Sequence, residues 1–310
     1  MNTLRESVHD YLAMRRSLGY KLKDPGRGLL DFVDFLEQHH AAYVTTSLAL
    51  EWAQKPSSAQ PAEWARRLGF VRSFARYRSA IDPCTEIPPL GLLPFHSGRA
   101  RPYFYSDDEI EQLLASALSL PPEGGLKRWT YYCLFGLLAV SGLRISEAIG
   151  LKLEDVDLRE DLLTIRGTKF GKSRLVPVHV TTRDILADYI SRRERLPAGR
   201  CATHLFVSEC GNRLHGSAVR QTFYQLSRQI GLRGPTASHG PRLHDFRHRF
   251  ALNTLLRWYQ SGEDAERRLP ALSTYLGHVQ VSYTYWYLNA SPELMGLAVK
   301  RLEHRWEAQS

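Results

Sequence analysis

Roughly the first ninety residues carry apolar positions at the spacing of amphipathic helices. Four such segments follow one another: residues 3–18, residues 25–39, a short stretch after Thr46, and residues 61–81. The first ends before Gly19, which favours the left-handed backbone found at helix ends, and Thr45 and Thr46 are of a type that caps helix starts. In the fourth, the apolar residues that share one face are Leu68, Val71, Phe74 and Ala75. The pattern therefore predicts an N-terminal domain made of helices.

The helical pattern fails between residues 82 and 102. That stretch, DPCTEIPPLGLLPFHSGRARP, holds five prolines and has the composition of a linker. We therefore expect a first domain of residues 1–98 and a second of residues 101–310. The second opens with Ser106 and Glu109, the S-x-x-E pattern of a capping box. Further helices are expected at residues 127–140, from Arg144 after a break at Gly142, at residues 216–230 and at residues 292–306.

Three short β-branched segments with turn residues around them predict strands. They cover residues 155–158, 162–166 and 174–178. The last two are joined by GTKFGKS, in which Gly171 permits a tight turn. The expected fold is therefore mainly α, with a helical N-terminal domain and an α+β second domain that contains a small antiparallel three-stranded sheet.

The strongest helical pattern, in residues 242–288, also carries the most reactive side chains. His244 and Arg247 lie three positions apart in RLHDFRHRFALNTLLRW, so both project from one face of a helix. His278 follows a glycine at a helix-end signal, and Tyr287 comes nine positions later. Arginine grips phosphoryl oxygens, histidine moves protons and tyrosine can become a covalent nucleophile. This combination indicates chemistry on a phosphate.

Composition agrees with a polyanionic partner inside the cell. A formal charge of +9 together with 11% aromatic residues favours a nucleic acid over a basic tail. The four cysteines form no CxxC pair and have no histidine at zinc-ligand spacing, so we expect neither disulfides nor a structural metal. The start, MNTLRESVHDYL, is too charged for a signal peptide, and the apolar run of residues 131–140 is too short to cross a bilayer. These features predict a cytoplasmic protein without membrane association.

Five motifs of the second domain, taken in order, resemble those of tyrosine recombinases of the phage integrase type. They are SGLRISEAIGL, TKFGKSRLVPV, LHDFRH, LGH and a tyrosine nine residues after that histidine. The resemblance covers the whole second domain, and the first domain is similar to the family's core-binding module more loosely. The segment RWYQSGEDAERRLP is longer than its counterpart in Xer-like members. With the ending TYWYL, this makes the chain more similar to recombinases carried by transposons and other mobile elements.

The resemblance assigns a role to each reactive residue. Tyr287 would attack a DNA phosphodiester to give a 3′-phosphotyrosyl bond, without ATP, metal or any cofactor. The remaining catalytic roles are a clamp on the phosphoryl oxygens (Arg144 and Arg247), the general acid on the departing 5′-oxygen (Lys169), assistance in proton transfer (His244) and a hydrogen bond to phosphate (His278). Losing one such preorganised donor typically costs on the order of 10²–10³ in rate.

Several assignments have alternatives. Lys172 competes with Lys169 as the general acid, and Tyr285 competes with Tyr287, whereas Tyr275 and Tyr283 are more typical of an aromatic core stripe. Glu147, one turn after Arg144, either orients the site or is an ordinary surface carboxylate. His248 is expected to point elsewhere on its helix, as a surface or packing residue.

Contacts with DNA outside the site are expected from two helices. The residues concerned are Arg72 and Arg76 on the fourth helix, and Arg220, Gln221 and Arg228 in residues 216–230. Such types suit phosphates and groove edges, and a solvated helix face is the alternative. The resemblance implies that the partner is double-stranded DNA with inverted-repeat core sites and that the protein forms a homo-tetramer in the synaptic complex. A helper recombinase or a directionality protein is a further possible partner. A topoisomerase of type IB and a non-catalytic DNA-binding accessory protein are the alternative functions.

Overall fold

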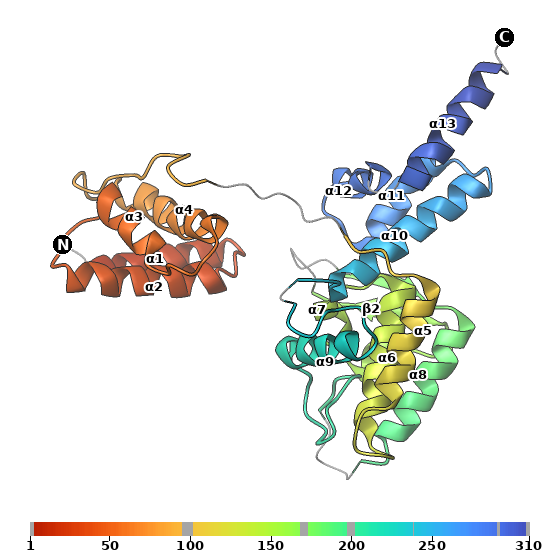
Figure 1. The fold of residues 1–310 in the computed structure, drawn as a ribbon. Coiled ribbons are helices and arrows are strands. Elements are labelled where there is room, and N and C mark those ends of the chain that lie inside the picture. The colour runs from red at the N-terminus through yellow and green to blue at the C-terminus, as the bar shows by residue number, and fades with distance from the viewer. Residues whose placement is uncertain are drawn as a thin grey trace. The chain divides into compact units, whose positions relative to one another are not determined.

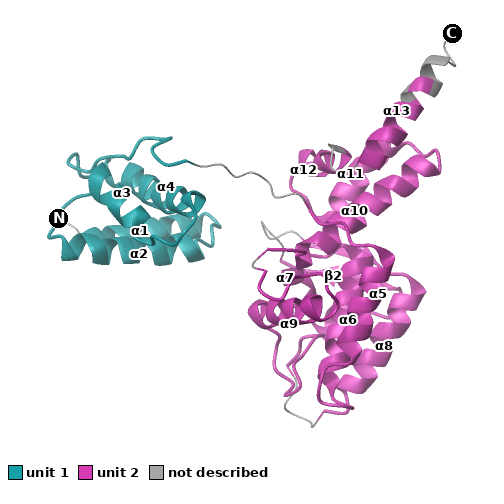
Figure 2. Cartoon of the chain, viewed as in Figure 1, with its two compact units in different colours: residues 1–100 teal, residues 101–310 magenta. Residues whose placement is uncertain are grey.

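The computed structural model divides into two compact units, residues 1–100 and 101–310, each with its own apolar core (Figure 2). The residues that it describes are 3–94, 102–167, 173–196, 202–237, 239–289 and 292–307. Within that part of the chain, no helix is both long and apolar enough to span a bilayer.

The described part of the first unit contains the four predicted helices (Figure 1). They are α1 (Leu4–Ser17), α2 (Lys23–Gln38), α3 (Thr46–Gln54) and α4 (Pro61–Arg78). Helix α4 packs on α2 and α3, and the rings of Phe32, Trp52 and Phe74 are fully buried between them. The start of α1 is fixed by Thr3, whose side chain accepts from the backbone NH of Glu6, and α3 is capped by Thr45 in the same way. Periodicity thus predicted these helices correctly, although α4 ends at Arg78 rather than at residue 81.

The second unit is built around α6, a helix that is apolar on most sides and packs against α5, α8 and α10. Its helices are α5 (Asp107–Leu118), α6 (Leu126–Ser141), α7 (Ile145–Ala148), α8 (Val180–Arg193), α9 (Gly216–Gln229), α10 (Leu243–Gln260), α11 (Ala265–Leu276), α12 (Ser282–Tyr285) and α13 (Pro292–Glu307). The capping box predicted at Ser106 and Glu109 is confirmed at the start of α5. The predicted fold class, mainly helical with one small sheet, is confirmed as well.

The sheet has three antiparallel strands in the order β1-β2-β3. Strand β1 is Val156–Asp157, β2 is Leu162–Ile165 and β3 is Arg174–Pro177. Leu163 of β2 faces Val176 of β3, and both are fully buried against the helices. The strands are where they were predicted, each a residue or two shorter. Residues 168–172, which follow β2 and precede β3 in the sequence and include Lys169 and Lys172, lie outside the described residues.

The C-terminal part of the second unit has a small apolar core of its own, to which α10, α11 and α13 contribute. The segment RWYQSGEDAERRLP, residues 257–270, contributes the last turn of α10 and the first turns of α11. Gly262 has a φ of 72° between them, and the side chain of Asp264 caps α11. The predicted C-terminal helix is α13, whose Leu294 is buried in this core.

Candidate functional site

Arg144 is placed by the way in which α6 ends. Gly142 terminates α6 with a φ of 60°, and a Cβ there would lie 2.6 Å from Cδ1 of Phe250, so the turn requires glycine. The chain then reverses into α7, and the Arg144 guanidinium extends towards the end of α11. Its Nη1 donates to Oε1 of Glu147 at 2.7 Å, and its Nη2 donates to the carbonyl of Gly277 at 3.0 Å.

Glu147 lies between two arginines. Arg174 on β3 donates from Nη1 to Oε1 at 3.1 Å and from Nη2 to Oε2 at 2.9 Å, while Arg144 contributes its guanidinium and its backbone NH. The Glu147 side chain is only 7% exposed. Burial raises the pKa of this carboxyl, but the bonds from Arg174 and Arg144 outweigh it and lower the pKa to about 2. Glu147 is therefore not an ordinary surface carboxylate, because its side chain is buried and paired with both arginines.

Arg247 is almost completely enclosed, with 1% of its surface exposed. Its Nη1 donates to the carbonyl of Gly142 at 2.9 Å and its Nη2 donates to that of Leu276, so one guanidinium joins the ends of α6 and α11. Burial and the nearby charge of Arg144 lower the pKa of Arg247 to about 10. The group therefore remains a cation at neutral pH.

Tyr287 lies in a 3-10 turn, η3 (Trp286–Asn289), and is 2% exposed. Its hydroxyl is 3.2 Å from Nδ1 of His248, whose ring also contacts Trp286. The ring of His278 stacks on that of Tyr287, with centroids 6.3 Å apart and planes at 15°. The tyrosine is thus held between two histidines from different elements.

His278 follows Gly277, which ends α11 in the left-handed conformation, as the helix-end signal predicted. Its Nδ1 is 2.8 Å from Oγ1 of Thr284, a fully buried residue of α12. This contact fixes the ring so that its other nitrogen faces away from Thr284. The carbonyl of Gly277 accepts from Arg144. The turn after α11 therefore carries both this carbonyl and the ring of His278.

His244 occupies the first turn of α10, with its ring 4.7 Å from that of His248 and perpendicular to it. His244 as a whole is exposed, but its ring is partly buried. This burial and the charge of Arg247 lower the pKa of the imidazole. His244 is therefore neutral at pH 7.

The rival tyrosines are placed differently from Tyr287. Tyr283 and Tyr285 are 49% and 50% exposed. Tyr275 stacks on Phe250, and burial raises its pKa to about 12. It belongs to the packing of α10 on α11, as expected for a member of an aromatic stripe.

The structure thus brings together Arg144, Glu147, Arg247, His278 and Tyr287, with His244 beside Arg247. Two residues of the cluster were missed. The prediction that His248 points elsewhere was wrong, because η3 folds back onto α10 at that residue. Arg174 lies within the hairpin motif TKFGKSRLVPV. Its place as a charged residue at the start of a strand next to the site could have predicted its contact with the site.

The residues expected to contact DNA divide into two kinds. Arg72 is engaged within its own unit: its Nε donates to the carbonyl of Pro88 at 2.7 Å and its Nη2 to that of Pro89 at 2.8 Å. Arg76, one turn on, is exposed. On α9, the predicted residues Arg220, Gln221 and Arg228 are all exposed.

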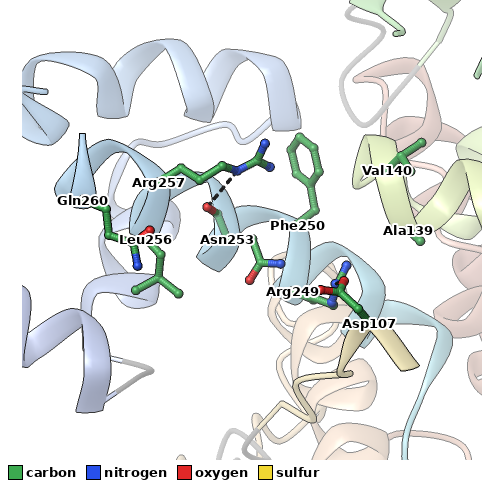
Figure 3. A pocket seen from close by; sticks show the side chains of 9 residues that line it. All are labelled: Asp107, Ala139, Val140, Arg249, Phe250, Asn253, Leu256, Arg257 and Gln260. Atoms are coloured by element: carbon green, nitrogen blue, oxygen red, sulfur yellow. Dashed lines mark hydrogen bonds and ion pairs between the residues drawn. The ribbon is translucent and has the colours of Figure 1, made fainter. Parts of the chain in front are cut away.

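A pocket of about 520 Å³ lies on another side of α10 (Figure 3). It is lined by Phe250, Asn253, Leu256 and Arg257 of α10 and by Ala139 and Val140 of α6. At its end, Arg249 forms an ion pair with Asp107 at the start of α5. None of the predicted catalytic residues lines this pocket.

Comparison with known proteins decides the family. The profile of the phage integrase family matches residues 104–293, which include every predicted catalytic residue. The chain belongs to this family. It is accordingly a tyrosine recombinase, a class of site-specific recombinases.

Individual relatives of this recombinase carry names that agree with the family assignment. A Sinorhizobium fredii protein with the provisional name integrase/recombinase y4rB is 60% identical over 99% of both chains. The tyrosine recombinase XerC of Thermodesulfovibrio yellowstonii is 30% identical, covering 72% of this chain and 69% of its own. Among solved structures, the Tn1549 transposon integrase in complex with a circular intermediate DNA has a TM-score of 0.64, at 18% identity over 97% of this chain and 100% of that one.

Proposed function

We propose that this recombinase cuts and rejoins double-stranded DNA through a covalent 3′-phosphotyrosyl intermediate on Tyr287. The observation that carries the proposal is the meeting of Tyr287 with two histidines and two arginines at the joined ends of α6, α10 and α11. Each of these groups has a task in moving a phosphoryl group from one oxygen to another.

Arg144 and Arg247 are the phosphate clamp. Arg247 uses Nη1 and Nη2 to hold two backbone carbonyls, and a guanidinium has five NH donors, so donors remain for the non-bridging oxygens. Because both arginines are held in place before DNA arrives, little reorganisation is needed as charge builds on the phosphorane-like transition state. Glu147 and Arg174 keep Arg144 in its position.

The leaving 5′-oxygen needs a proton, and we assign this task to Lys169, which lies between β2 and β3 in the sequence. Strand β3 is tied to the site by the ion pair between Arg174 and Glu147. His278 donates to a phosphoryl oxygen from the nitrogen that faces away from Thr284.

DNA is the partner that fits this chemistry and the charge of +9. We assign the first unit to DNA binding and the second to catalysis, with four copies acting on paired inverted-repeat sites. Exposed Arg76 on α4, and Arg220, Gln221 and Arg228 on α9, would contact the duplex. The long segment between LHDFRH and LGH, and the fold shared with a transposon integrase, support a role in the movement of a mobile element.

The test uses nicked duplexes taken from DNA that flanks the gene, incubated with protein in EDTA and separated on a denaturing gel. Wild type is expected to give a protein–DNA adduct, and Tyr287→Phe none. Tyr285→Phe is the matched control and should give the adduct at the wild-type level. An adduct that persists in Tyr287→Phe but disappears in Tyr285→Phe would transfer the nucleophile to Tyr285. Binding without any adduct would support an accessory DNA-binding protein instead.

A second candidate, a topoisomerase of type IB, shares the same covalent chemistry. A plasmid with two copies of the site distinguishes the two functions. Recombination gives rearranged circles, whereas a topoisomerase would relax supercoils and leave the order of the sites unchanged.

A further inference from the structure

The phenol of Tyr287 is in contact with one particular base. Its Oη lies 3.2 Å from Nδ1 of His248, within hydrogen-bonding distance, and both residues are buried. The resemblance to known recombinases suggested His244 for proton transfer. In this chain, an imidazole within hydrogen-bonding distance of the nucleophilic oxygen belongs to His248.

A tyrosine needs such a neighbour before it can attack. A phenol has a pKa of about 10, so only about one molecule in a thousand is ionised at neutral pH. A base that takes the proton as the O–P bond forms commonly contributes 10²- to 10⁴-fold to a rate, provided that it lies within hydrogen-bonding reach. His248 meets that requirement of distance.

The surroundings of His248 also give the proton a way out. The ring of His244 lies perpendicular to it at 4.7 Å, and His244 is exposed to water at the start of α10. The charged groups that act on His244 are Arg247, Asp245, Arg144 and Arg242, and the rings of Trp286 and Tyr287 contact that of His248.

We propose that His248 is the catalytic base that accepts the phenolic proton of Tyr287, with His244 as the outlet of that proton to solvent. In the step, the O–H bond of Tyr287 breaks and its proton moves to Nδ1 of His248. The phenolic oxygen forms a bond to phosphorus, and the bond from phosphorus to the 5′-oxygen breaks. That oxygen takes a proton from the general acid. Religation reverses each transfer. This assignment rests on the proposed function, because it needs Tyr287 as the nucleophile.

His248→Asn is the decisive variant. The side-chain oxygen of asparagine can occupy nearly the place of Nδ1, so the hydrogen bond to Tyr287 is retained while proton transfer is lost. His179→Asn is the matched control, since His179 caps the start of α8 and asparagine is also a good cap. Melting curves of both variants report whether the fold is kept.

Adduct formation is measured in single turnover on two duplexes, one normal and one with sulfur in place of the bridging 5′-oxygen. A thiolate departs without protonation, so the sulfur substrate removes the need for the general acid only. We expect His248→Asn to be slower than wild type by about 10²-fold or more on both duplexes. Lys169→Ala should be slow on the oxygen substrate and recover on sulfur. His179→Asn should match wild type on both.

The pH profile gives an independent readout. Without its base, the tyrosine must ionise to water, so the rate of His248→Asn should rise about tenfold per pH unit as long as the phenol is mostly protonated. The wild-type rate should become independent of pH at a lower pH than the rate of His248→Asn. Recovery of His248→Asn on the sulfur duplex, or a rate within about threefold of wild type on both, would overturn the assignment. Failure of the proposed function looks different: wild type would then form no adduct, or Tyr287→Phe would still form one.

Discussion

Arg174 and Glu147 are joined by two parallel hydrogen bonds, of 3.1 Å and 2.9 Å, that tie strand β3 to helix α7. The same arginine donates from Nε to the carbonyl of Tyr275 at 2.7 Å, near the end of α11. One guanidinium, with its side chain only 10% exposed, thus connects strand β3, the helix that follows Arg144 and the helix that precedes His278. The ion pair is therefore a structural support of the whole site.

Loss of the Glu147 charge should destabilise the second unit in a way that depends on pH. The pKa of this carboxyl is lowered to about 2, from an ordinary value near 4.5. Its contribution is therefore fully present above about pH 4.5 and disappears as the pH falls towards 2. A pKa lowered from 4.5 to about 2 corresponds to a contribution to the free energy of unfolding on the order of 3 kcal/mol at neutral pH.

Urea unfolding of wild type and Glu147→Gln at several pH values measures the contribution of the Glu147 charge to stability. The difference in unfolding free energy should be largest at pH 7 and shrink between pH 4.5 and 2. Glu154→Gln, whose carboxylate is exposed beside Lys152, is the control and should change stability little at any pH. A Glu147→Gln penalty that is constant over this range would contradict the ion-pair explanation.

Periodicity was enough to predict most of the helices and the sheet, because each of these elements buries one face of its own sequence, whereas α8 was not predicted. The site residues Arg144, Arg247, His278 and Tyr287 could be named because they lie in motifs. Arg174 and His248, which contact these residues or their neighbours, could not be predicted from motifs. Arg174 meets Glu147 across 27 residues, and His248 meets Tyr287 across 39, so each contact exists only once β3 reaches α7 or η3 returns to α10. His248 was misplaced because only the faces of its own helix were considered.

Replacing Arg247 by lysine should impair cleavage more than DNA binding. An ammonium cannot hold the carbonyls of Gly142 and Leu276 and also reach a phosphate, because it lacks the planar fork of the guanidinium. We expect the rate of adduct formation to fall on the order of 10²–10³-fold. Arg257→Lys on the same helix is exposed and lines the pocket of Figure 3, and it should cleave at the wild-type rate. Equal losses of binding and cleavage in Arg247→Lys would argue against a clamp that acts in the transition state.

Gly277 should be intolerant of even a methyl group. It has a φ of 65°, and a Cβ there would lie 2.8 Å from Nη1 of Arg174 and 3.5 Å from Nη1 of Arg144. Gly277→Ala therefore adds crowding of two site arginines to the strain of a left-handed residue, which alone costs roughly 1 kcal/mol. Gly262→Ala is the matched control, since Gly262 has a φ of 72° and no heavy atom within 4 Å of the added Cβ. Melting temperature should fall in both variants, and cleavage should fall only in Gly277→Ala.

Thr284 should control His278 without touching DNA. Its Oγ1 lies 2.8 Å from Nδ1 of His278, and the threonine is fully buried in α12. Thr284→Val keeps the shape of the side chain and removes this one hydrogen bond, whose contribution is about 1 kcal/mol. If His278 must present its other nitrogen to the phosphate, adduct formation should slow by about fivefold while DNA affinity stays the same. Thr254→Val provides the comparison, because Thr254 bonds only to the carbonyl of Phe250 within α10 and should leave the rate unchanged. A Thr284→Val variant that melts earlier but cleaves at the wild-type rate would reduce this contact to simple packing, and the orientation of His278 would then have to come from its stacking on Tyr287.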